Sequence, residues 1–410
     1  MTVALLSIGT ALLRGEVTDT NGPWLAAELT QMGFRVAAYE ATADDPKRLA
    51  SALSRLGDEH TMIVATGGLG PTNDDVTAEV AATVAGVPLH CNEDALAAIR
   101  RRLKEREIEE TSGHEKQAML PEGSTALLDG DGISPGFIQR IGRSTAYFLP
   151  GVPVEMRSMF AEEVAPRIRA AATKDSFQIC LRTYGMRESE IGKRLQDLER
   201  AHPEIGVVFV TQRPEVHVRI LARSANYADA RGKAEAAARD VRERLGEIVY
   251  GEGDDTMPVV AGRLVRAKGW RLATAESCTG GLIARQLTAQ PASDFFAGSA
   301  VTYANSAKTR LLGVSEDTLR GHGAVSAEVA AEMAEGARRT FDCQLAVSVT
   351  GIAGPSGATS DKPLGLVYWA ASHPGGTEVE HEVFDGNRAQ VQRQAALAAL
   401  NLLRRILRPE

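Results

Sequence analysis

The decisive stretch of this sequence is Trp270-Arg-Leu-Ala-Thr-Ala-Glu-Ser-Cys-Thr-Gly-Gly-Leu282. Its first half predicts a short buried strand, and a helical pattern of apolar positions opens at Thr279. Ser277 is therefore expected at a turn from strand to helix, where free N–H groups can stabilise negative charge. The two glycines would let a substrate approach the backbone closely. A helix N-cap followed by close-packing glycines explains the same residues equally well.

The residues downstream of this stretch favour a reactive site. A further strand is expected over Ala300–Asn305, and it delivers Tyr303 and Lys308 a few residues apart. Serine, lysine and tyrosine together can supply a nucleophile, its base and a proton relay. We therefore predict acyl-transfer chemistry at Ser277, although a lysine taken alone is usually a solvated helix residue.

Composition narrows the class of protein. A chain of 410 residues holds about two to four domains, and its 44% hydrophobic and 24% charged residues are typical of a globular protein. With 46 Lys and Arg against 53 Asp and Glu, the net charge of −7 argues against direct nucleic-acid binding. We see no basic leader and no apolar run that could span a bilayer. The four cysteines lack metal-type spacing, so we expect reduced thiols in a cytoplasmic protein without a membrane partner.

The N-terminal part alternates strands and helices. Strands are expected over residues 3–8, 34–39 and 61–65, and helices over 24–32 and 46–56. This alternation predicts a parallel sheet covered by helices. Directly after the third strand comes Thr66-Gly-Gly-Leu-Gly-Pro-Thr-Asn-Asp-Asp-Val-Thr77, a glycine-rich turn suited to cradling phosphate. It lacks the Gly-Lys-Ser/Thr ending of a Walker loop.

Two aspartates in this turn leave two interpretations open. Pro71 and Thr72 suit a helix start, which would place Asp74 and Asp75 in the first turn as capping residues. Adjacent carboxylates beside phosphate groups are also suited to holding a magnesium ion.

The middle of the chain has a separate α+β pattern. Strands are expected over residues 177–183, 206–209 and 216–221, followed by a long amphipathic helix over Tyr227–Leu245. The order is compatible with a KH-like fold, but the loops contain no Gly-x-x-Gly clamp. A structural spacer is therefore favoured over an RNA-binding module.

With these residues in place, essentially the whole chain resembles the competence/damage-inducible protein CinA family. The N-terminal motifs are Ser7-Ile-Gly-Thr-Ala-Leu-Leu-Arg-Gly15, Asp19-Thr-Asn21 and Thr66–Thr77. The C-terminal motifs are Ala275-Glu-Ser-Cys-Thr-Gly-Gly281, Val301-Thr-Tyr-Ala-Asn-Ser-Ala-Lys308, Gly323-Ala-Val-Ser326 and Thr350-Gly-Ile-Ala-Gly-Pro355. The resemblance implies an α/β protein of three domains. They are a molybdopterin-binding-like domain over 1–170, a KH-like α+β domain over 171–252 and a nicotinamide-nucleotide amidase domain over 253–410.

The resemblance also implies roles in the C-terminal domain. Ser277 would attack the carboxamide of nicotinamide mononucleotide, Lys308 would accept its proton, and Tyr303 would orient or relay it, with no cofactor. The implied substrate contacts are Thr279, Gly280, Gly281, Gly351, Gly354 and Arg388. Cys278 is rejected as the nucleophile because the family motif places the reactive group on the preceding serine. Since the ordinary lysine pKa is near 10.4, burial or positive charge must lower the pKa of Lys308.

In some family members the N-terminal domain acts as a metal-dependent ADP-ribose pyrophosphatase. The implied nucleotide contacts here are Gly67, Gly68, Gly70, Thr72 and Lys116, with Asp74 and Asp75 as ligands of magnesium or cobalt. Three departures weaken this inheritance: Ala11 replaces an acidic residue, Gly113-His-Glu115 lacks the usual asparagine, and Gly132-Ile-Ser-Pro-Gly136 replaces Gly-Thr-Ala-Pro-Gly. We therefore expect an ADP-ribose-like nucleotide to bind there and to be hydrolysed slowly or not at all.

The resemblance further implies small-molecule nucleotides as substrates and a homodimeric assembly. The rival hypothesis is a non-catalytic binding or scaffold protein of competence or the DNA-damage response. The acidic composition offers no support for direct DNA contact.

Overall fold

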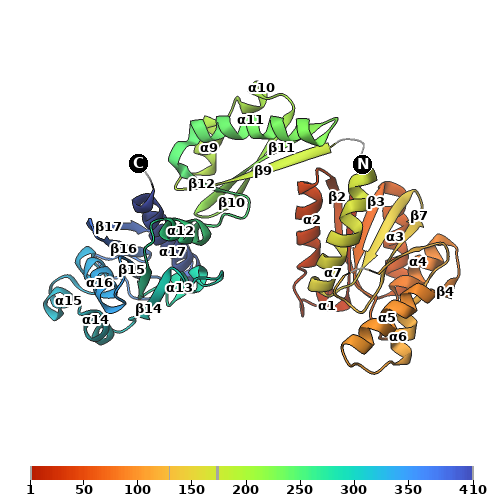
Figure 1. Cartoon of the computed structure of the whole chain (residues 1–410), viewed down its shortest axis with the longest axis horizontal. Coiled ribbons are helices and arrows are strands. Elements are labelled where there is room, and N and C mark those ends of the chain that lie inside the picture. Colours follow the sequence, from red (N-terminus) through yellow and green to blue (C-terminus); the bar gives the residue numbers. More distant parts are fainter. Residues whose placement is uncertain (1, 129, 172–174, 409–410) are drawn as a thin grey trace. The chain divides into compact units, whose positions relative to one another are not determined.

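The computed structural model describes residues 2–128, 130–171 and 175–408. The chain divides into two compact units, residues 1–178 with 221–234 and residues 179–220 with 235–410. Strands and helices mix throughout (Figure 1), which confirms the predicted α/β class. The expected domain boundaries near residues 170 and 252 stay a prediction.

The N-terminal sheet has six strands in the order β2-β1-β3-β8-β7-β6. They are β1 (Thr2–Ile8), β2 (Arg35–Thr42), β3 (Met62–Thr66), β6 (Thr125–Leu127), β7 (Gly136–Ile141) and β8 (Ser144–Leu149). Strands β2, β1, β3 and β8 are parallel neighbours, whereas β7 and β6 are antiparallel. The predicted parallel arrangement of the first three strands is thus confirmed, and β7 and β6 extend the sheet with antiparallel strands that were not predicted. The tight turn at Gly142, with φ 54°, joins β7 to β8, and such a turn allows only an antiparallel pair.

Helices cover both faces of this sheet. They are α1 (Thr10–Leu13), α2 (Asn21–Gln31), α3 (Pro46–Glu59), α4 (Thr77–Ala85), α5 (Glu93–Glu105), α6 (Ser112–Gln117), α7 (Pro153–Met159), the π-helical η1 (Phe160–Val164) and α8 (Ala165–Ala171). A separate pair, β4 (Leu89–Cys91) and β5 (Met119–Pro121), is antiparallel.

The side chains of β1 alternate between the two faces of the sheet, and each face has its own hydrophobic core. Val3 and Leu5 pack on the side of α2 and α7. Ala4 and Leu6 point the other way and pack on the side of α3 and α4. Successive side chains of a strand point to opposite faces, so a run of apolar residues predicts cover on both faces.

The middle sheet has the order β10-β11-β9-β12. Its strands are β9 (Asp175–Tyr184), β10 (Ile205–Gln212), β11 (Glu215–Ser224) and β12 (Val249–Glu252), and its helices are α9 (Glu188–Arg194), α10 (Leu198–Ala201), α11 (Tyr227–Leu245) and the 3₁₀ turn η2 (Gly246–Ile248). The helix predicted over Tyr227–Leu245 is confirmed with the same bounds.

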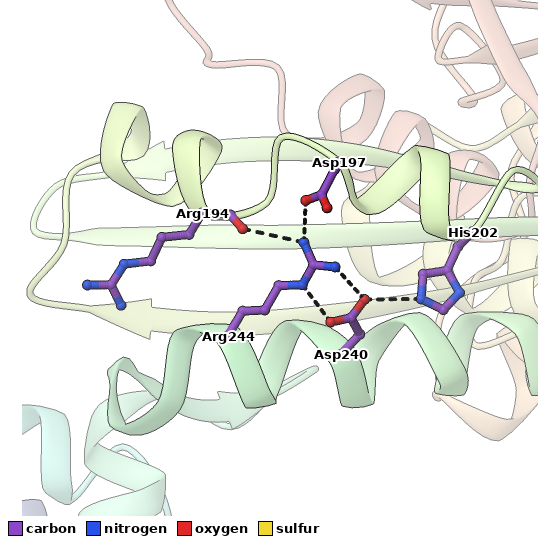
Figure 2. A network of polar contacts seen from close by, with 5 residues as sticks. All are labelled: Arg194, Asp197, His202, Asp240 and Arg244. Carbon is purple, nitrogen blue, oxygen red and sulfur yellow. Dashed lines mark hydrogen bonds and ion pairs between the residues drawn. The ribbon is translucent and has the colours of Figure 1, made fainter.

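One arginine organises a polar network in this part of the chain (Figure 2). Arg244 donates from Nε and Nη2 to both carboxylate oxygens of Asp240, at 2.5 and 2.9 Å, and from Nη1 to Asp197 at 2.6 Å. His202 Nε2 lies 3.3 Å from Asp240 Oδ2. The hydrogen bonds from Arg244 lower the pKa of both carboxyl groups. The network therefore ties the α10 segment to α11 wherever the aspartates are ionised.

The C-terminal sheet has five strands in the order β14-β13-β15-β16-β17, of which the first three are parallel. The strands are β13 (Leu272–Glu276), β14 (Phe296–Val301), β15 (Leu345–Gly351), β16 (Leu366–His373) and β17 (Gly376–Val383). The helices are α12 (Met257–Ala267), α13 (Leu282–Leu287), α14 (Asn305–Leu312), α15 (Glu316–His322), α16 (Ala327–Thr340) and α17 (Arg388–Leu407).

The connections around β13 decide where a site can form. Helices α12, α13 and α17 pack on one face of the sheet, and α14 and α16 pack on the other (Figure 1). The chain leaves β13 toward β14 on one side and later returns to β15 on the other. Strands whose connections diverge in this way open a crevice beyond their carboxyl ends. Ser277 follows β13 directly and lies at that edge.

Among residues 2–128, 130–171 and 175–408, no helix combines the length and the apolarity needed to cross a bilayer.

Candidate active site

Ser277 lies in a tight turn between β13 and α13. Its N–H donates to Val349 O at 2.9 Å, which holds the turn against β15. Gly280 and Gly281 have φ values of 63° and 96°, in the left-handed region that favours glycine. The helix expected from Thr279 therefore begins only at Leu282, because a helix cannot continue through these two conformations.

Lys308 reaches Ser277 from α14. Its side chain is only 1% exposed, and Nζ lies 3.1 Å from Ser277 Oγ. Nζ also donates to the carbonyl oxygens of Thr302, at 2.9 Å, and Tyr303, at 3.4 Å. Burial lowers the pKa of Lys308. A lysine held against a serine hydroxyl in a dry site is suited to accepting the serine proton.

Tyr303 contacts Lys308 through its backbone and not through its ring hydroxyl. It follows β14, which spans Phe296–Val301, so the strand expected over Ala300–Asn305 lies about four residues earlier than predicted and only Ala300 and Val301 are shared. Its side chain is 60% exposed, and its hydroxyl accepts from Arg388 Nη2 at 2.7 Å. Arg388 Nη1 donates to Gly354 O at 2.8 Å. The structure thus groups Tyr303, Gly354 and Arg388, and the proton-relay role of the Tyr303 hydroxyl stays a prediction.

The backbone N–H groups predicted to contact the substrate differ in whether they already donate to another residue. Gly280 N donates to Ser277 O at 3.1 Å, and Gly281 N donates to the Glu276 side chain at 3.0 Å. Within the described part of the chain, the N–H groups of Cys278 and Thr279 have no acceptor on another residue. The buried Thr279 hydroxyl also has no partner there. Of the donors expected at this turn, Thr279 is therefore free to meet a ligand, whereas Gly280 and Gly281 are not.

Two further residues of the site are explained by packing or burial. A Cβ on Gly351 would lie 2.7 Å from the Val367 side chain, so the sheet itself requires this glycine. Cys278 is buried, and burial raises the pKa of its thiol to about 12. A protonated, buried thiol is unreactive, which agrees with the choice of Ser277 over Cys278.

Sequence reasoning assigned no role to Glu276. Its side chain is completely buried and accepts hydrogen bonds at the start of α13. The sequence held one signal for a role of Glu276, a carboxylate directly before a serine at a predicted turn.

The N-terminal glycine loop is shaped by close packing. Gly67 and Gly68 have φ values of 106° and 65°. A Cβ on Gly67 would lie 2.1 Å from Ile8 O, and one on Gly68 would lie 2.2 Å from Thr77 Oγ1. A Cβ on Gly70 would meet the Asp75 carboxylate at 2.6 Å. Packing and backbone conformation therefore require Gly67 and Gly68, so the presence of these two glycines does not argue for phosphate.

The aspartates of this loop do not lie in a helix. Helix α4 begins at Thr77, so the prediction that Asp74 and Asp75 occupy its first turn is wrong. Asp75 Oδ2 instead accepts from the N–H and the hydroxyl of Thr72, at 2.9 and 2.7 Å. Such local side-chain bonds stabilise a turn in competition with a helix. Asp74 is exposed.

Helix α6 borders the same loop. Lys116 Nζ donates to Thr72 O, and Gln117 Nε2 donates to Leu69 O at 3.0 Å and to Ser134 Oγ at 2.6 Å. The structure thus brings the predicted Lys116 and Thr72 together. The altered segments 113–115 and 132–136 both adjoin these contacts.

Two buried amide oxygens near this loop have no hydrogen-bond partner among the residues that the structure describes. Gln117 Oε1 is one. The other is Asn21 Oδ1, whose amide nitrogen donates to Gly151 O at 2.8 Å. Gly151 adjoins Gly67, since a Cβ added to Gly151 would lie 3.4 Å from Gly67 Cα. Buried acceptors without donors are rare, and a ligand that brings N–H or O–H groups would satisfy them.

The metal prediction has limited support from the protein alone. Over the described ranges, no three His, Cys, Asp or Glu side chains gather closely enough to hold a metal ion. Asp74 and Asp75 would hold magnesium or cobalt only together with phosphate oxygens and water. Magnesium is commonly bound in that way, so the residues fit such an ion.

Comparison with known proteins places these features in one family. The family model "CinA C-terminal domain" matches residues 254–407, "Damage-inducible protein CinA KH domain" matches 179–251, and "Probable molybdopterin binding domain" matches 4–170. A CinA-like protein of Geobacter sulfurreducens is 42% identical and is covered, like this chain, over 99% of its length. The chain belongs to the CinA family. A second CinA-like protein, from Geobacter metallireducens, is 43% identical over 99% of both chains.

Membership of the CinA family confirms the resemblance seen in the sequence. A crystal structure of a CinA superfamily protein from Klebsiella pneumoniae is 36% identical to this chain, with a TM-score of 0.36, and covers 37% of this chain and 95% of its own. The names of these CinA relatives state no substrate, so the chemistry of the Ser277 site is a separate question.

Proposed function

We propose that the C-terminal domain hydrolyses the carboxamide of nicotinamide mononucleotide to nicotinate mononucleotide and ammonia. The observation that supports this most is the buried Lys308 Nζ, 3.1 Å from Ser277 Oγ. The motifs shared with the CinA family supply the substrate class. Arg388, next to Tyr303 and Gly354, is proposed to contact the phosphate or to orient the carboxamide.

The proposed reaction proceeds through an acyl-enzyme. Ser277 Oγ bonds to the carboxamide carbon, its proton passes to Lys308 Nζ, and the carbonyl π electrons move to oxygen. The C–N bond then breaks, and the proton on Nζ leaves with the nitrogen as ammonia. Water then adds to the ester carbon as Lys308 Nζ takes one of its protons. The Ser277 Oγ–carbon bond breaks, Nζ returns that proton to Oγ, and the acid is released. No cofactor is needed for these steps.

Ammonia release by the purified full chain tests this proposal. We expect nicotinamide mononucleotide to yield equal amounts of ammonia and nicotinate mononucleotide, measured by a coupled assay and by chromatography. Nicotinamide riboside, which lacks the phosphate, is expected to react more slowly. A chain that is folded and releases no ammonia from the nucleotide would contradict the proposal.

The pH dependence of the rate follows from the state of Lys308. The lysine must be neutral to accept a proton, and burial lowers its pKa. The rate constant kcat is therefore expected to rise with pH through this lowered pKa and to level off below the ordinary lysine value of about 10.4. Initial rates from about pH 6 to pH 10 measure the curve. A rate that climbs without levelling until the ordinary lysine pKa would show that the lysine is not perturbed.

We further propose that the N-terminal domain binds an ADP-ribose-like nucleotide. Its support is a pair of buried oxygens, Asn21 Oδ1 and Gln117 Oε1, which have no partner within the described ranges. The amide nitrogens of the same side chains donate to Gly151 O, beside the glycine loop, and to Leu69 O, within it. Ribose hydroxyls or a base amine would donate to them. A divalent ion held by Asp74 and Asp75 would reduce the charge of the diphosphate. Ala11 in place of an acidic residue supports slow or absent hydrolysis, because such positions affect rate more than affinity.

Calorimetry and a hydrolysis assay separate the two halves of this second proposal. We expect ADP-ribose to bind more tightly with magnesium or cobalt present, and AMP to form slowly or not at all. Replacing Gln117 with leucine is expected to weaken binding at least about tenfold, since the proposed contact of Oε1 is lost together with the bonds from Nε2 to Leu69 O and Ser134 Oγ. The control, Asn92→Ala, removes the side-chain cap of α5, which accepts from Ala95 N, and leaves the side-chain bonds of Gln117 in place. Rapid metal-dependent AMP formation would overturn the role given to Ala11, and the absence of binding would reduce the domain to a scaffold.

The assembly is proposed to be a homodimer, and light scattering of the full chain measures its mass.

A further inference from the structure

Glu276 is a buried carboxylate with no part in the reaction steps above. Its side chain is completely buried. Oε2 accepts from the N–H groups of Gly281, at 3.0 Å, and Ile283, at 3.1 Å. Oε1 accepts from Ala284 N at 2.9 Å and from Thr274 Oγ1 at 3.4 Å. All four donors are neutral groups, so aligned hydrogen bonds hold both side-chain oxygens of Glu276.

Because of these bonds, the N–H groups at the start of α13 cannot donate to a ligand. The N–H groups of Gly281, Ile283 and Ala284 all point at Glu276, and Gly280 N is bonded to Ser277 O. Across the described ranges, this leaves Cys278 N and Thr279 N at the turn without an acceptor on another residue. The Thr279 hydroxyl, 4% exposed as a residue, is unpartnered as well.

The backbone holds Glu276 and the nucleophile in one rigid turn. Glu276 O accepts from Thr302 N at 2.8 Å, and the Thr302 carbonyl in turn accepts from Lys308 Nζ. Ser277 N is bonded to Val349 O. The carboxylate therefore anchors one end of the turn whose other end carries the serine.

We infer that Glu276 is a positioning residue that closes the helix end to the substrate and presents Cys278 N, Thr279 N and the Thr279 hydroxyl as the oxyanion donors. This inference rests on the proposed amidase function. When Ser277 Oγ bonds to the carboxamide carbon, the carbonyl oxygen gains the electron pair and its negative charge. Donors held in place before that step stabilise the charge without reorganising, and they act mainly in the transition state.

The variant Glu276→Gln tests the assignment with little change in shape. Its NH₂ group must face at least one backbone N–H of α13, so the anchoring of the turn is lost on one side. We expect kcat to fall about 10²-fold with KM changed less than about threefold, because the donors act on the oxyanion and not on the bound amide. The apparent pKa of the pH–rate profile is expected to stay unchanged, since Lys308 keeps its surroundings. Glu276→Asp, which keeps the charge, is expected to retain more activity.

A matched control measures the effect of lost stability alone. Ser315 caps α15 in the same domain, and Ser315→Ala is expected to lower the melting temperature with kcat unchanged. If Glu276→Gln instead lowers kcat, raises KM and shifts the pH profile, Glu276 has only a structural role. If the wild-type chain is active and Glu276→Gln keeps its kcat within about threefold, the inference fails. If the wild-type chain releases no ammonia, the proposed function fails first.

A second measurement uses the wild-type chain and does not depend on a variant that folds. Nicotinate mononucleotide places a carboxylate oxygen where the oxyanion would form. Its addition is expected to shift the amide NMR resonances of Cys278 and Thr279 and to leave those of Gly281, Ile283 and Ala284 nearly unchanged. The reverse pattern would show that the helix end holds the ligand, and it would overturn the inference.

Discussion

Replacing Ser277 with alanine is expected to abolish the release of ammonia from nicotinamide mononucleotide. The hydroxyl oxygen is the atom that Lys308 Nζ contacts at 3.1 Å, and no other hydroxyl or thiol of the motif has such a base. Loss of a nucleophile of this kind lowers kcat about 10⁶-fold, which here means to background. The measurement is ammonia production by the full chain at saturating substrate.

Folding of Ser277→Ala is expected to be preserved. The turn is held by the backbone bond from Ser277 N to Val349 O and by the two glycines, and alanine keeps all of these. Circular dichroism and the melting temperature check this, with Ser315→Ala as the active control. A folded Ser277→Ala protein with a rate near that of the wild type would show that another group is the nucleophile.

Replacing Lys308 with methionine is expected to lower kcat about 10²–10⁴-fold, the usual contribution of a general base. Methionine is close to lysine in length and fills the buried space. It also removes a basic group that burial disfavours in its charged form. The variant is therefore expected to fold at least as stably as the wild type at neutral pH. The rise of rate with pH should disappear together with the activity.

Two companion variants separate the role of a base from that of a positive charge. Lys308→Arg keeps a charge but cannot accept a proton, so it is expected to be about as inactive as the methionine variant. Tyr303→Phe removes only the hydroxyl that accepts from Arg388, so a smaller loss is expected. An unchanged rate and pH profile in Lys308→Met would remove the lysine from the mechanism. If Lys308→Arg is active, the lysine acts through its positive charge and not as a base.

The order of strands and helices could be predicted where local patterns are strong. Helix α11 has the predicted bounds because its apolar positions recur with the helical period along its length. Strand β13 and the turn at Ser277 were predicted because a short apolar run meets two glycines. The start of α4 was missed by several residues, since the Asp75 side chain bonds to Thr72 and holds a turn there. The two antiparallel strands β7 and β6 of the N-terminal sheet were missed because strand pairing depends on residues far apart in the chain.

The sequence by itself determined the family, the succession of elements and the position of Ser277 at the end of a strand, because each depends on residue types at short spacing. Only the tertiary structure decided what the side chains meet. Lys308 follows Ser277 by 31 positions, and the folding of α14 against the sheet brings Nζ to the hydroxyl and buries it. The same packing turns the Tyr303 hydroxyl to Arg388 and aims three N–H groups at Glu276. Burial and hydrogen-bond partners are set by contacts between distant residues, so the pKa of the lysine and the choice of donors cannot be inferred from local pattern.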